Sequence, residues 1–315
     1  MSTQLIRRKP INYQAKDEWL FVKGFNYRFE EPSYEKFSNG FWDCFKTKAI
    51  ATKLQKASAF FRTMLGRKSI IEIDSFIWAT NANSENYFHW FNDVLPSIYY
   101  LKTIGVAVPV LLNEKLVSKP FVKPSLKLLQ VEYKTVLASN IIKFKAAFKL
   151  TLTAGEGNQH PYYFPQISEL FRSHQKFSFD VSDKVFIVRS NLKNRNLYPI
   201  DEVSALFIKF GFLIVDTEKM TFAEQMTMFS RCTHLAAVHG AGLTNMLFMP
   251  KNSKILEFRR SDDDHNNCYF SMADTLRLNY YYFLTESMIK GVCVQEDNFK
   301  ADLTSLENLL HTFSK

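Results

Sequence analysis

Apolar and polar positions along residues 184–283 switch between two periodicities. Short apolar runs predict strands at 184–189, 211–216, 233–238, 254–258 and 280–283. Between these runs, apolar residues return every three or four positions, as at Val203, Leu206, Phe207 and Phe210, which predicts intervening helices. Strands that alternate with helices are typical of a doubly wound parallel sheet, so this half of the chain is expected to be α/β and Rossmann-like.

Local signals mark where the predicted helices begin and end. Gly211 directly follows a helical pattern, where a glycine stops a helix. Thr221 and Glu224 have the spacing of a capping box, in which two side chains satisfy backbone N–H groups reciprocally. Near the end of the chain, residues 303–313 place leucine and phenylalanine on one side of a predicted helix.

The most informative stretch is residues 239–250, HGAGLTNMLFMP, which puts a glycine-rich turn between a strand and an apolar helix. Gly240 and Gly242 are expected to adopt backbone angles closed to other residues and to let a ligand approach closely. A helix predicted from Leu243 directs its unpaired N–H groups and positive dipole end at the turn. A diphosphate suits that place. The alternative is a tight structural turn with a packed histidine.

Polar side chains follow three of the predicted strands. Arg189 and Arg195 come after the first strand, His239 to Gly242 after the third, and Glu257 lies at the fourth. Because ligands bind beyond the carboxyl ends of parallel strands, we expect these groups to converge. Each arginine can bind two phosphate oxygens at once through its guanidinium group, and a carboxylate can accept hydrogen bonds from two ribose hydroxyls. The alternatives are a solvated charged loop for the arginines and ion pairs with neighbouring arginines for Glu257.

A second polar pattern lies in the first half of the chain, where residues 83–100 predict a helix capped by Asn83 or Ser84. Asn86, His89 and Asp93 then share one face, because residues three or four apart are neighbours on a helix. The residues between them can pack into the domain: Phe88, Phe91, Val94 and Leu95. His89 oriented by Asp93 can act as a general base, and direct action by Asp93 is the alternative. A structural histidine with a surface carboxylate is the simpler interpretation.

Together these segments resemble glycosyltransferase family 61. The pattern N-x-x-H-x-x-x-D-x-L-P stands here as Asn86 to Pro96. The blocks VFIVRS, GFLIVD and MTFAEQMTMFSRCTHLAAVHGAGLTNMLFMPKNSKILEF follow it in the expected order. The resemblance covers residues 83–283.

The resemblance implies a GT-B architecture, in which two Rossmann-like domains face each other across a cleft. We expect an acceptor-side domain at residues 1–175 and a nucleotide-sugar-binding domain at residues 176–315, with a C-terminal helix that returns to the first domain. The implied reaction is an inverting, metal-independent sugar transfer from a nucleotide-diphosphate donor to a glycan or lipid-linked acceptor. Its expected place is capsular or other surface polysaccharide synthesis, with the nucleotide sugar as substrate and no cofactor.

The resemblance also assigns roles to residues. His89 and Asp93 are the expected catalytic residues, and Asn86 lies on the acceptor side. The expected nucleotide-sugar-binding residues are Arg189, Arg195, His239, Gly240, Ala241, Gly242, Leu243, Thr244, Asn245 and Glu257. Two other functions stay open at this point: a pyruvyl-type transferase acting on polysaccharide precursors, and a non-catalytic nucleotide-sugar-binding partner of another transferase.

Composition narrows the range of partners. A chain of 315 residues exceeds the size at which one core usually keeps growing, so two domains are expected. A formal net charge of +9 favours anionic partners such as nucleotide diphosphates, lipid diphosphates or a membrane surface. The chain has neither zinc-ligand spacing nor an RNA-binding signature, so nucleic acid is not an expected partner. Asp262 to Asp264 lie in a polar run and are interpreted as a solvated loop, not as a metal site.

Sequence signals for location favour the cytoplasm. Residues 1–10 are basic without a following apolar stretch, and no segment reaches the ~20 apolar residues that a membrane span requires. Four cysteines without paired spacing fit a reducing compartment: Cys44, Cys232, Cys268 and Cys293. Residues 46–68 combine basic and apolar positions, as in a helix that lies on the inner membrane, and packing on its own domain is the alternative.

Overall fold

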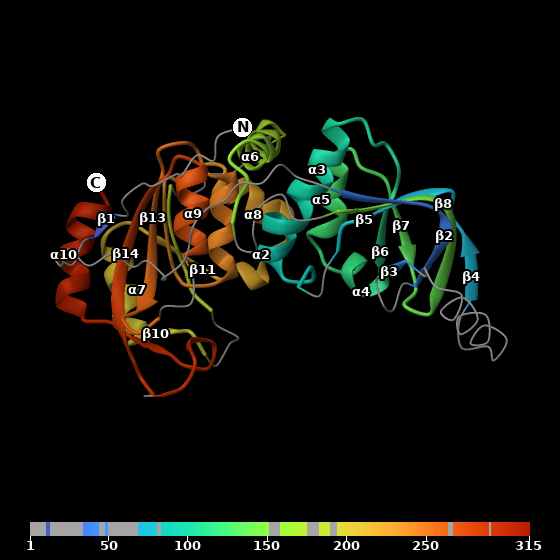
Figure 1. The fold of residues 1–315 in the computed structure, drawn as a ribbon. Helices are drawn as coiled ribbons and strands as arrows, with labels where there is room; N and C mark the ends of the chain where they lie inside the picture. The colour runs from blue at the N-terminus through green and yellow to red at the C-terminus, as the bar shows by residue number, and fades with distance from the viewer. Residues whose placement is uncertain are drawn as a thin grey trace, which may run out of the picture. The chain divides into compact units, whose positions relative to one another are not determined.

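The chain forms two compact units in the computed structural model (Figure 1). One spans Phe29–Glu156 and is called here the N-terminal unit, and Gly157–Lys315 form most of the C-terminal unit. The structure describes residues 11–12, 34–43, 48–49, 69–80, 83–150, 158–174, 183–189, 194–263, 267–289 and 291–315. The predicted membrane helix at 46–68 lies outside these residues, except that 48–49 form a strand. Cys44, Asp264 and residues 1–10 also lie outside the described residues.

The sheet of the C-terminal unit is largely parallel. Its strand order is β10-β15-β14-β13-β12-β9-β11, with β1 beside β14. Strands β9, β11, β12, β13 and β14 all run parallel, which confirms the α/β class. Their bounds are β1 Ile11–Asn12, β9 Lys184–Ile187, β10 Leu197–Tyr198, β11 Leu213–Val215, β12 His234–Val238, β13 Lys254–Arg260, β14 Asn279–Ser287 and β15 Phe299–Lys300.

Helices cover both faces of this sheet. The connection from β9 to β11 moves one way along the sheet and the connection from β11 to β12 moves back, so right-handed crossovers place their helices on opposite faces. Figure 1 shows α7 and α10 on one side and α6, α8 and α9 on the other. The helices are α6 Tyr163–Ser173, α7 Ile200–Lys209, η2 Thr217–Lys219, α8 Phe222–Phe229, η3 Ala241–Phe248, α9 Cys268–Thr275, η4 Val294–Glu296 and α10 Leu303–Phe313.

The local signals for helix ends are confirmed. Gly211 has φ +81°, the left-handed conformation that ends α7. Thr221 accepts a hydrogen bond from the Glu224 N–H, and the Glu224 carboxylate accepts one from the Thr221 N–H, so the capping box is complete at the start of α8.

The tail helix α10 packs in the core of the C-terminal unit itself. Leu306, Leu309, Leu310 and Phe313 are fully buried there beside the α7 residue Phe207. The helix was expected to return to the first domain. Instead, its apolar face packs against its own unit. Helix α6 precedes the boundary expected at residue 175 but belongs to the C-terminal unit. Its Ser168 donates to the Leu247 carbonyl of η3, and its Arg172 donates to the Met249 carbonyl.

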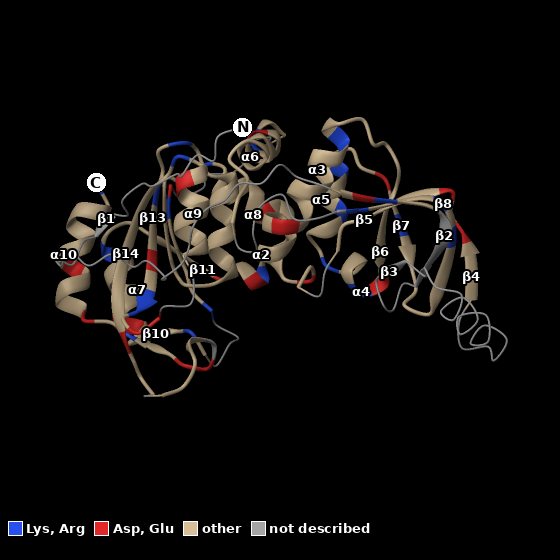
Figure 2. Cartoon of the chain, in the orientation of Figure 1, with Lys and Arg blue, Asp and Glu red and all other residues tan. Residues whose placement is uncertain are grey.

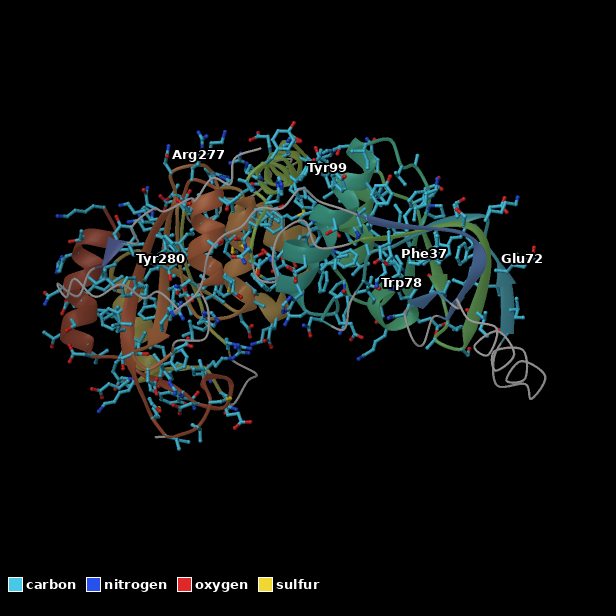
Figure 3. All side chains as sticks on the ribbon, viewed as in Figure 1. Phe37, Glu72, Trp78, Tyr99, Arg277 and Tyr280 are labelled. Atoms are coloured by element: carbon cyan, nitrogen blue, oxygen red, sulfur yellow. The ribbon has the colours of Figure 1, made fainter. Side chains whose placement is uncertain are left out.

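The N-terminal unit has a mixed sheet of its own. Its order is β3-β2-β8-β5-β6-β7, with β4 beside β8, and β8, β5, β6 and β7 run parallel while β2 is antiparallel to both neighbours. Trp78, Phe76 and Phe144 are buried in its core, and Phe37 packs against them (Figure 3). The strands are β2 Tyr34–Asp43, β3 Lys48–Ala49, β4 Ser69–Glu72, β5 Ser75–Trp78, β6 Val110–Asn113, β7 Tyr133–Val136 and β8 Asn140–Leu150.

The helices of this unit include one irregular stretch, which carries the polar pattern found in the sequence. They are α2 Tyr87–His89, the π-helix η1 Trp90–Val94, α3 Leu95–Thr103, α4 Glu114–Val117 and α5 Val122–Leu128. In the described part of the chain, no helix has both the length and the apolarity that crossing a bilayer requires.

Candidate functional site

The first group of candidate residues lies where α2 passes into η1. Asn86 is the N-cap of α2, and its side-chain oxygen accepts the Phe88 N–H at 2.9 Å. The expected caps, Asn83 and Ser84, are therefore wrong by two or three residues. Asn86 closes the helix end, so its amide oxygen holds the backbone that leads into His89.

A widened helical turn follows. Leu95 donates its N–H to the carbonyl of Trp90, five residues back, which defines the π-helix. Pro96 explains this local geometry, because it has no N–H to offer and its ring excludes the carbonyl four residues before it. Ser97 donates its hydroxyl to the Asp93 carbonyl at 2.8 Å and so satisfies that group. The sequence predicted one regular helix here, and the structure shows three segments.

His89 and Asp93 form a close pair across this turn. His89 Nδ1 lies 2.6 Å from Asp93 Oδ2, and Asn92 Nδ2 donates to Asp93 Oδ1 at 2.7 Å. The Asp93 side chain is 1% exposed, whereas that of His89 is 22% exposed. With the proton on Nδ1 donated to Asp93, the tautomer carries its lone pair on Nε2. The predicted pairing of the two residues is confirmed, and Asn92 is a third member that the sequence did not reveal.

Buried aromatic residues fix this pair in place. Trp90 and Phe91 are fully buried, and Trp90 Nε1 donates to Ser125 Oγ of α5 at 2.9 Å. The residues predicted to pack into the domain are all buried: Phe88, Phe91, Val94 and Leu95. The His89 ring therefore directly precedes a segment, Trp90 to Val94, whose residues are all buried.

The second group of candidate residues lies at a switch point of the parallel sheet. After β9, the chain forms β11 on one side of that strand and then β12 on the other. Ligands of doubly wound sheets bind beyond the carboxyl ends of the two strands at such a point. Arg189 follows β9, and His239 to Gly242 follow β12, so the topology places both at one edge of the sheet.

The turn after β12 brings two arginines together. A Cβ atom built on Gly240 lies 3.6 Å from Nη1 of Arg189 and 3.6 Å from Nη1 of Arg195. The convergence that was predicted from topology is therefore present within this unit. Arg195 has φ +60°, a left-handed backbone uncommon for a non-glycine residue, and its N–H donates to the Asp297 carbonyl at 2.6 Å.

The backbone reasoning for the glycines is corrected by the structure. Gly240 has φ 165° and ψ 172°, which is extended backbone open to any residue. Space is the real constraint at Gly242, where a Cβ atom would lie 3.3 Å from Cδ1 of Ile187. The helix that follows is a 3₁₀ helix from Ala241, not an α-helix from Leu243, and its first hydrogen bond runs from the Leu243 N–H to the Gly240 carbonyl. The N–H groups of Ala241 and Gly242 precede that bond.

Three of the predicted donor-binding residues have buried side chains. Leu243, Thr244 and Asn245 are each no more than 1% exposed. Asn245 Nδ2 donates to Gln225 Oε1 and to the Gly242 carbonyl, both at 3.1 Å. These contacts indicate that Asn245 stabilises the turn from inside, whereas His239, Ala241 and Gly242 are partly exposed.

His239 is held by a buried carboxylate. Its Nδ1 lies 2.5 Å from Oε1 of Glu257, and Tyr280 donates its hydroxyl to Oε2. Burial raises the pKa of Glu257, but His239, by charge and hydrogen bond, together with Arg259 and Tyr280, outweighs burial and holds the pKa below its ordinary value. Glu257 is 0% exposed and both of its oxygens are engaged. Its geometry therefore favours orienting His239 over direct contact with a ribose.

The surroundings of Arg189 do not fully balance the positive charge of its guanidinium group. Burial, followed by the positive charge of Arg195, lowers the pKa of Arg189. Among the described residues, Nη1 of Arg189 is buried without a hydrogen-bond partner, and Glu218 Oε1 lies 3.9 Å from Nη2. Two guanidinium groups that repel each other beside helix N–H groups are an arrangement that favours an anion.

Two tyrosines in this unit were not singled out as functional by the sequence reasoning. The Tyr269 ring packs edge-on against His239 with centroids 5.1 Å apart, and Tyr280 contacts Glu257. Both residues lie far from His239 in sequence. The pairing of β12, β13 and β14 brings Tyr280 near, and Tyr269 lies on α9. The tyrosine run at 280–282 was interpreted as strand, which is confirmed.

Two acidic residues after β13 are paired with arginines of that strand. Both charge signs occur along β13 itself (Figure 2). Arg259 contacts Asp263 at 3.1 Å, and both are buried, while Arg260 contacts Asp262 at 2.7 Å. The solvated loop predicted at residues 262–264 is thus wrong for Asp263. Within the described ranges, no group of three or more His, Cys, Asp or Glu side chains has a metal-binding arrangement.

Comparison with known protein families gives a match, which covers both groups of candidate residues in part. The family described as Glycosyltransferase 61 matches residues 87–256. This chain belongs to glycosyltransferase family 61. The match includes both His89 with Asp93 and the turn after β12, so the resemblance drawn from the two motifs is confirmed. A search among curated proteins gives no match.

Proposed function

We propose that this family 61 glycosyltransferase moves a sugar, with inversion at the anomeric carbon, from a nucleotide-diphosphate donor to a glycan or lipid-linked acceptor. The observation that carries the proposal is the pair of arginines beside the Gly240 turn, with Nη1 of Arg189 buried and unpartnered. Membership of the family favours sugar transfer over pyruvyl transfer. Surface polysaccharide synthesis in the cytoplasm is part of the same proposal.

The leaving diphosphate is assigned to the switch point of the C-terminal unit. Arg189 and Arg195 supply positive charge, and the N–H groups of Ala241 and Gly242 supply donors. Because the guanidinium groups are fixed before the phosphate arrives, they stabilise the charge that develops as the glycosidic bond breaks. In this proposal the arginines take the part that a divalent cation plays in other transferases.

The proton of the acceptor hydroxyl is assigned to His89. Nε2 carries the lone pair, because Nδ1 donates to Asp93, and a base must lie within ~2.6–3.2 Å of the proton it removes. As the acceptor oxygen attacks the anomeric carbon, its proton passes to Nε2, the bond to the diphosphate oxygen breaks, and the buried Asp93 stabilises the imidazolium. Attack from the face opposite the leaving group gives inversion. Two separate sheets, one in each unit, support the GT-B class as part of this proposal.

A ligand screen followed by product analysis tests the proposal. Nucleoside diphosphates and their sugars are added to the full chain, and a ligand at 100 times its Kd is expected to add ~2.7 kcal/mol to the stability of the folded state. The sugar released from the best donor is then followed by NMR, where inversion shows the opposite anomer first. Arg189→Gln is expected to lose the ligand-induced stabilisation, and Arg231→Gln, at an exposed arginine of the same unit, is the matched control. A screen without any stabilising nucleotide contradicts the proposal.

A further inference from the structure

A groove runs along the outer strand of the C-terminal sheet and ends beside the anion site. Its cavity volume is about 640 Å³, within the range of small-molecule sites. We call it the β11 groove. One wall is β11, at the sheet edge, and the other is η2 with α8. Its lining is mainly apolar and includes Leu213, Val215, Met220, Ala223, Thr227 and Met228.

Strand pairing connects the groove to Arg189. β11 is the direct neighbour of β9, and the Val188 N–H donates to the Val215 carbonyl at 2.8 Å. The next residue after Val215, Asp216, lines the groove, and the next residue after Val188 is Arg189. Asp216, at the polar end of the groove, and Arg189 therefore both lie beyond the carboxyl ends of the parallel strands.

Side-chain contacts connect the groove to the Gly240 turn as well. Gln225 of α8 donates Nε2 to the Thr217 carbonyl at 3.0 Å and accepts Asn245 Nδ2 at its Oε1. A Cβ atom built on Gly242 lies 3.8 Å from Thr217 Oγ1. The η2 segment that closes the groove is thus in contact with the turn that holds the anion in the proposed function.

Asp216 is placed where a ribose is expected. It directly follows β11, and a carboxylate at the carboxyl end of a strand in a doubly wound sheet can accept hydrogen bonds from ribose hydroxyls. Its Oδ1 accepts the Glu218 N–H at 3.0 Å, and its Oδ2 lies 3.5 Å from Lys219 Nζ. Asp216 also lines the groove, so it lies beside the space in which the ribose is placed.

We propose that the β11 groove binds the nucleoside half of the donor, with the ribose at Asp216 and the base against the apolar walls. This inference rests on the proposed function, because the diphosphate must lie beside Arg189 for the nucleoside to reach the groove. It also accounts for Glu257, which is 0% exposed and does not line the groove, whereas Asp216 does.

A substitution that fills the groove tests whether it binds the nucleoside independently of the anion site. Ala223 is exposed on α8 and lines the groove, so Ala223→Leu fills it without changing the core. Ala205→Leu, at an exposed alanine of α7, is the matched control. Calorimetry with two probes, uridine or guanosine diphosphate and inorganic pyrophosphate, is done on wild type and both variants. Ala223→Leu is expected to weaken the nucleoside diphosphate about 10–100-fold, as loss of an apolar subsite does, and to leave pyrophosphate unchanged.

The other outcomes distinguish the two proposals. If wild type binds neither probe, the proposed function fails. If wild type binds both and Ala223→Leu binds both as tightly, the groove is not the nucleoside site, while the anion site stands. Equal weakening of both probes by Ala223→Leu also overturns the inference, because pyrophosphate has no part to place in the groove.

The ribose contact has its own test. Asp216→Asn keeps the oxygen that accepts the Glu218 N–H but removes the charge. Wild type is expected to bind the ribonucleoside diphosphate more tightly than its 2′-deoxy analogue by about tenfold, and Asp216→Asn is expected to reduce that preference. An undiminished preference in Asp216→Asn overturns the assignment of Asp216.

Discussion

Replacing Asp93 by Asn tests whether His89 acts as a base whose tautomer is set by its partner. Asp93 accepts two hydrogen bonds, from His89 Nδ1 at 2.6 Å and from Asn92 Nδ2 at 2.7 Å. An asparagine has only one acceptor oxygen, so one of the two donors then faces an NH₂ group. If the amide oxygen stays with Asn92, His89 must accept at Nδ1 and carry its proton on Nε2. The nitrogen assigned to the acceptor proton is then occupied.

The expected loss follows from the size of base catalysis. A positioned general base contributes about 10²–10⁴-fold to the rate, which corresponds to ~3–5 kcal/mol of barrier. Asp93→Asn is expected to reduce kcat by this amount in donor hydrolysis, where water takes the place of the acceptor. Because Asp93 is 1% exposed, the mismatched amide is also expected to lower the free energy of unfolding by ~1–3 kcal/mol.

The assay compares three quantities for Asp93→Asn and a matched control. The control is Glu85→Gln, which neutralises a carboxylate close to His89 in the sequence. The Glu85 carboxylate contacts Lys115 and not His89. Both variants are expected to keep the affinity of wild type for the nucleoside diphosphate, and only Asp93→Asn is expected to lose turnover. An unchanged kcat in Asp93→Asn would refute the reasoning, and so would an equal loss in Glu85→Gln.

Three further predictions concern the C-terminal unit. Arg189→Gln is expected to raise the melting temperature of the ligand-free protein while it abolishes nucleotide binding, because burial and then Arg195 lower the Arg189 pKa and so oppose its charge. Tyr280→Phe removes a donor to the buried Glu257 and is expected to cost ~1–3 kcal/mol in urea unfolding. His234 has its pKa lowered from 6.5 to about 4, by burial first and then by two lysines, so the unfolded chain binds the extra proton between these values. Stability is therefore expected to fall by ~3 kcal/mol as the pH drops from 6.5 to about 4, and His234→Gln is expected to flatten that slope in pH-dependent unfolding.

Each of these predictions has a contradicting result. A lower melting temperature for Arg189→Gln means that its charge stabilises the fold. Wild-type stability of Tyr280→Phe means that Glu257 is satisfied without the phenol. An unchanged slope in His234→Gln assigns the acid sensitivity to other groups.

Sequence patterns predicted the features that depend on neighbours along the chain. The capping box at Thr221 and the pairing of His89 with Asp93 both follow from spacings of three and four residues, which a helix turns into contacts. The parallel order of strands followed from their alternation with helices. The same order gave the convergence of Arg189 with the turn after β12.

Features that depend on strand pairing escaped this reasoning. His239 and Glu257 are 18 residues apart and meet only because Ala237 pairs with Glu257 in the β12–β13 register. The sequence therefore suggested a ribose ligand where the structure has a buried partner of His239. The glycine-rich turn escaped it too, because Gly240 has extended backbone and the tight position is Gly242, where a Cβ atom would lie 3.3 Å from Cδ1 of Ile187 on the neighbouring strand β9.

Strand β1 has a consequence for any attempt to produce the C-terminal unit alone. Ile11 and Asn12 pair with Tyr281 and Tyr282 of β14, on the side of that strand not taken by β13. A protein cut before residue 157 leaves this stretch of β14 as a bare edge, and bare edges recruit strands from other molecules. Such a fragment is expected to aggregate. Tethering residues 11–12 to it through a flexible linker is expected to restore a monodisperse species in size-exclusion chromatography.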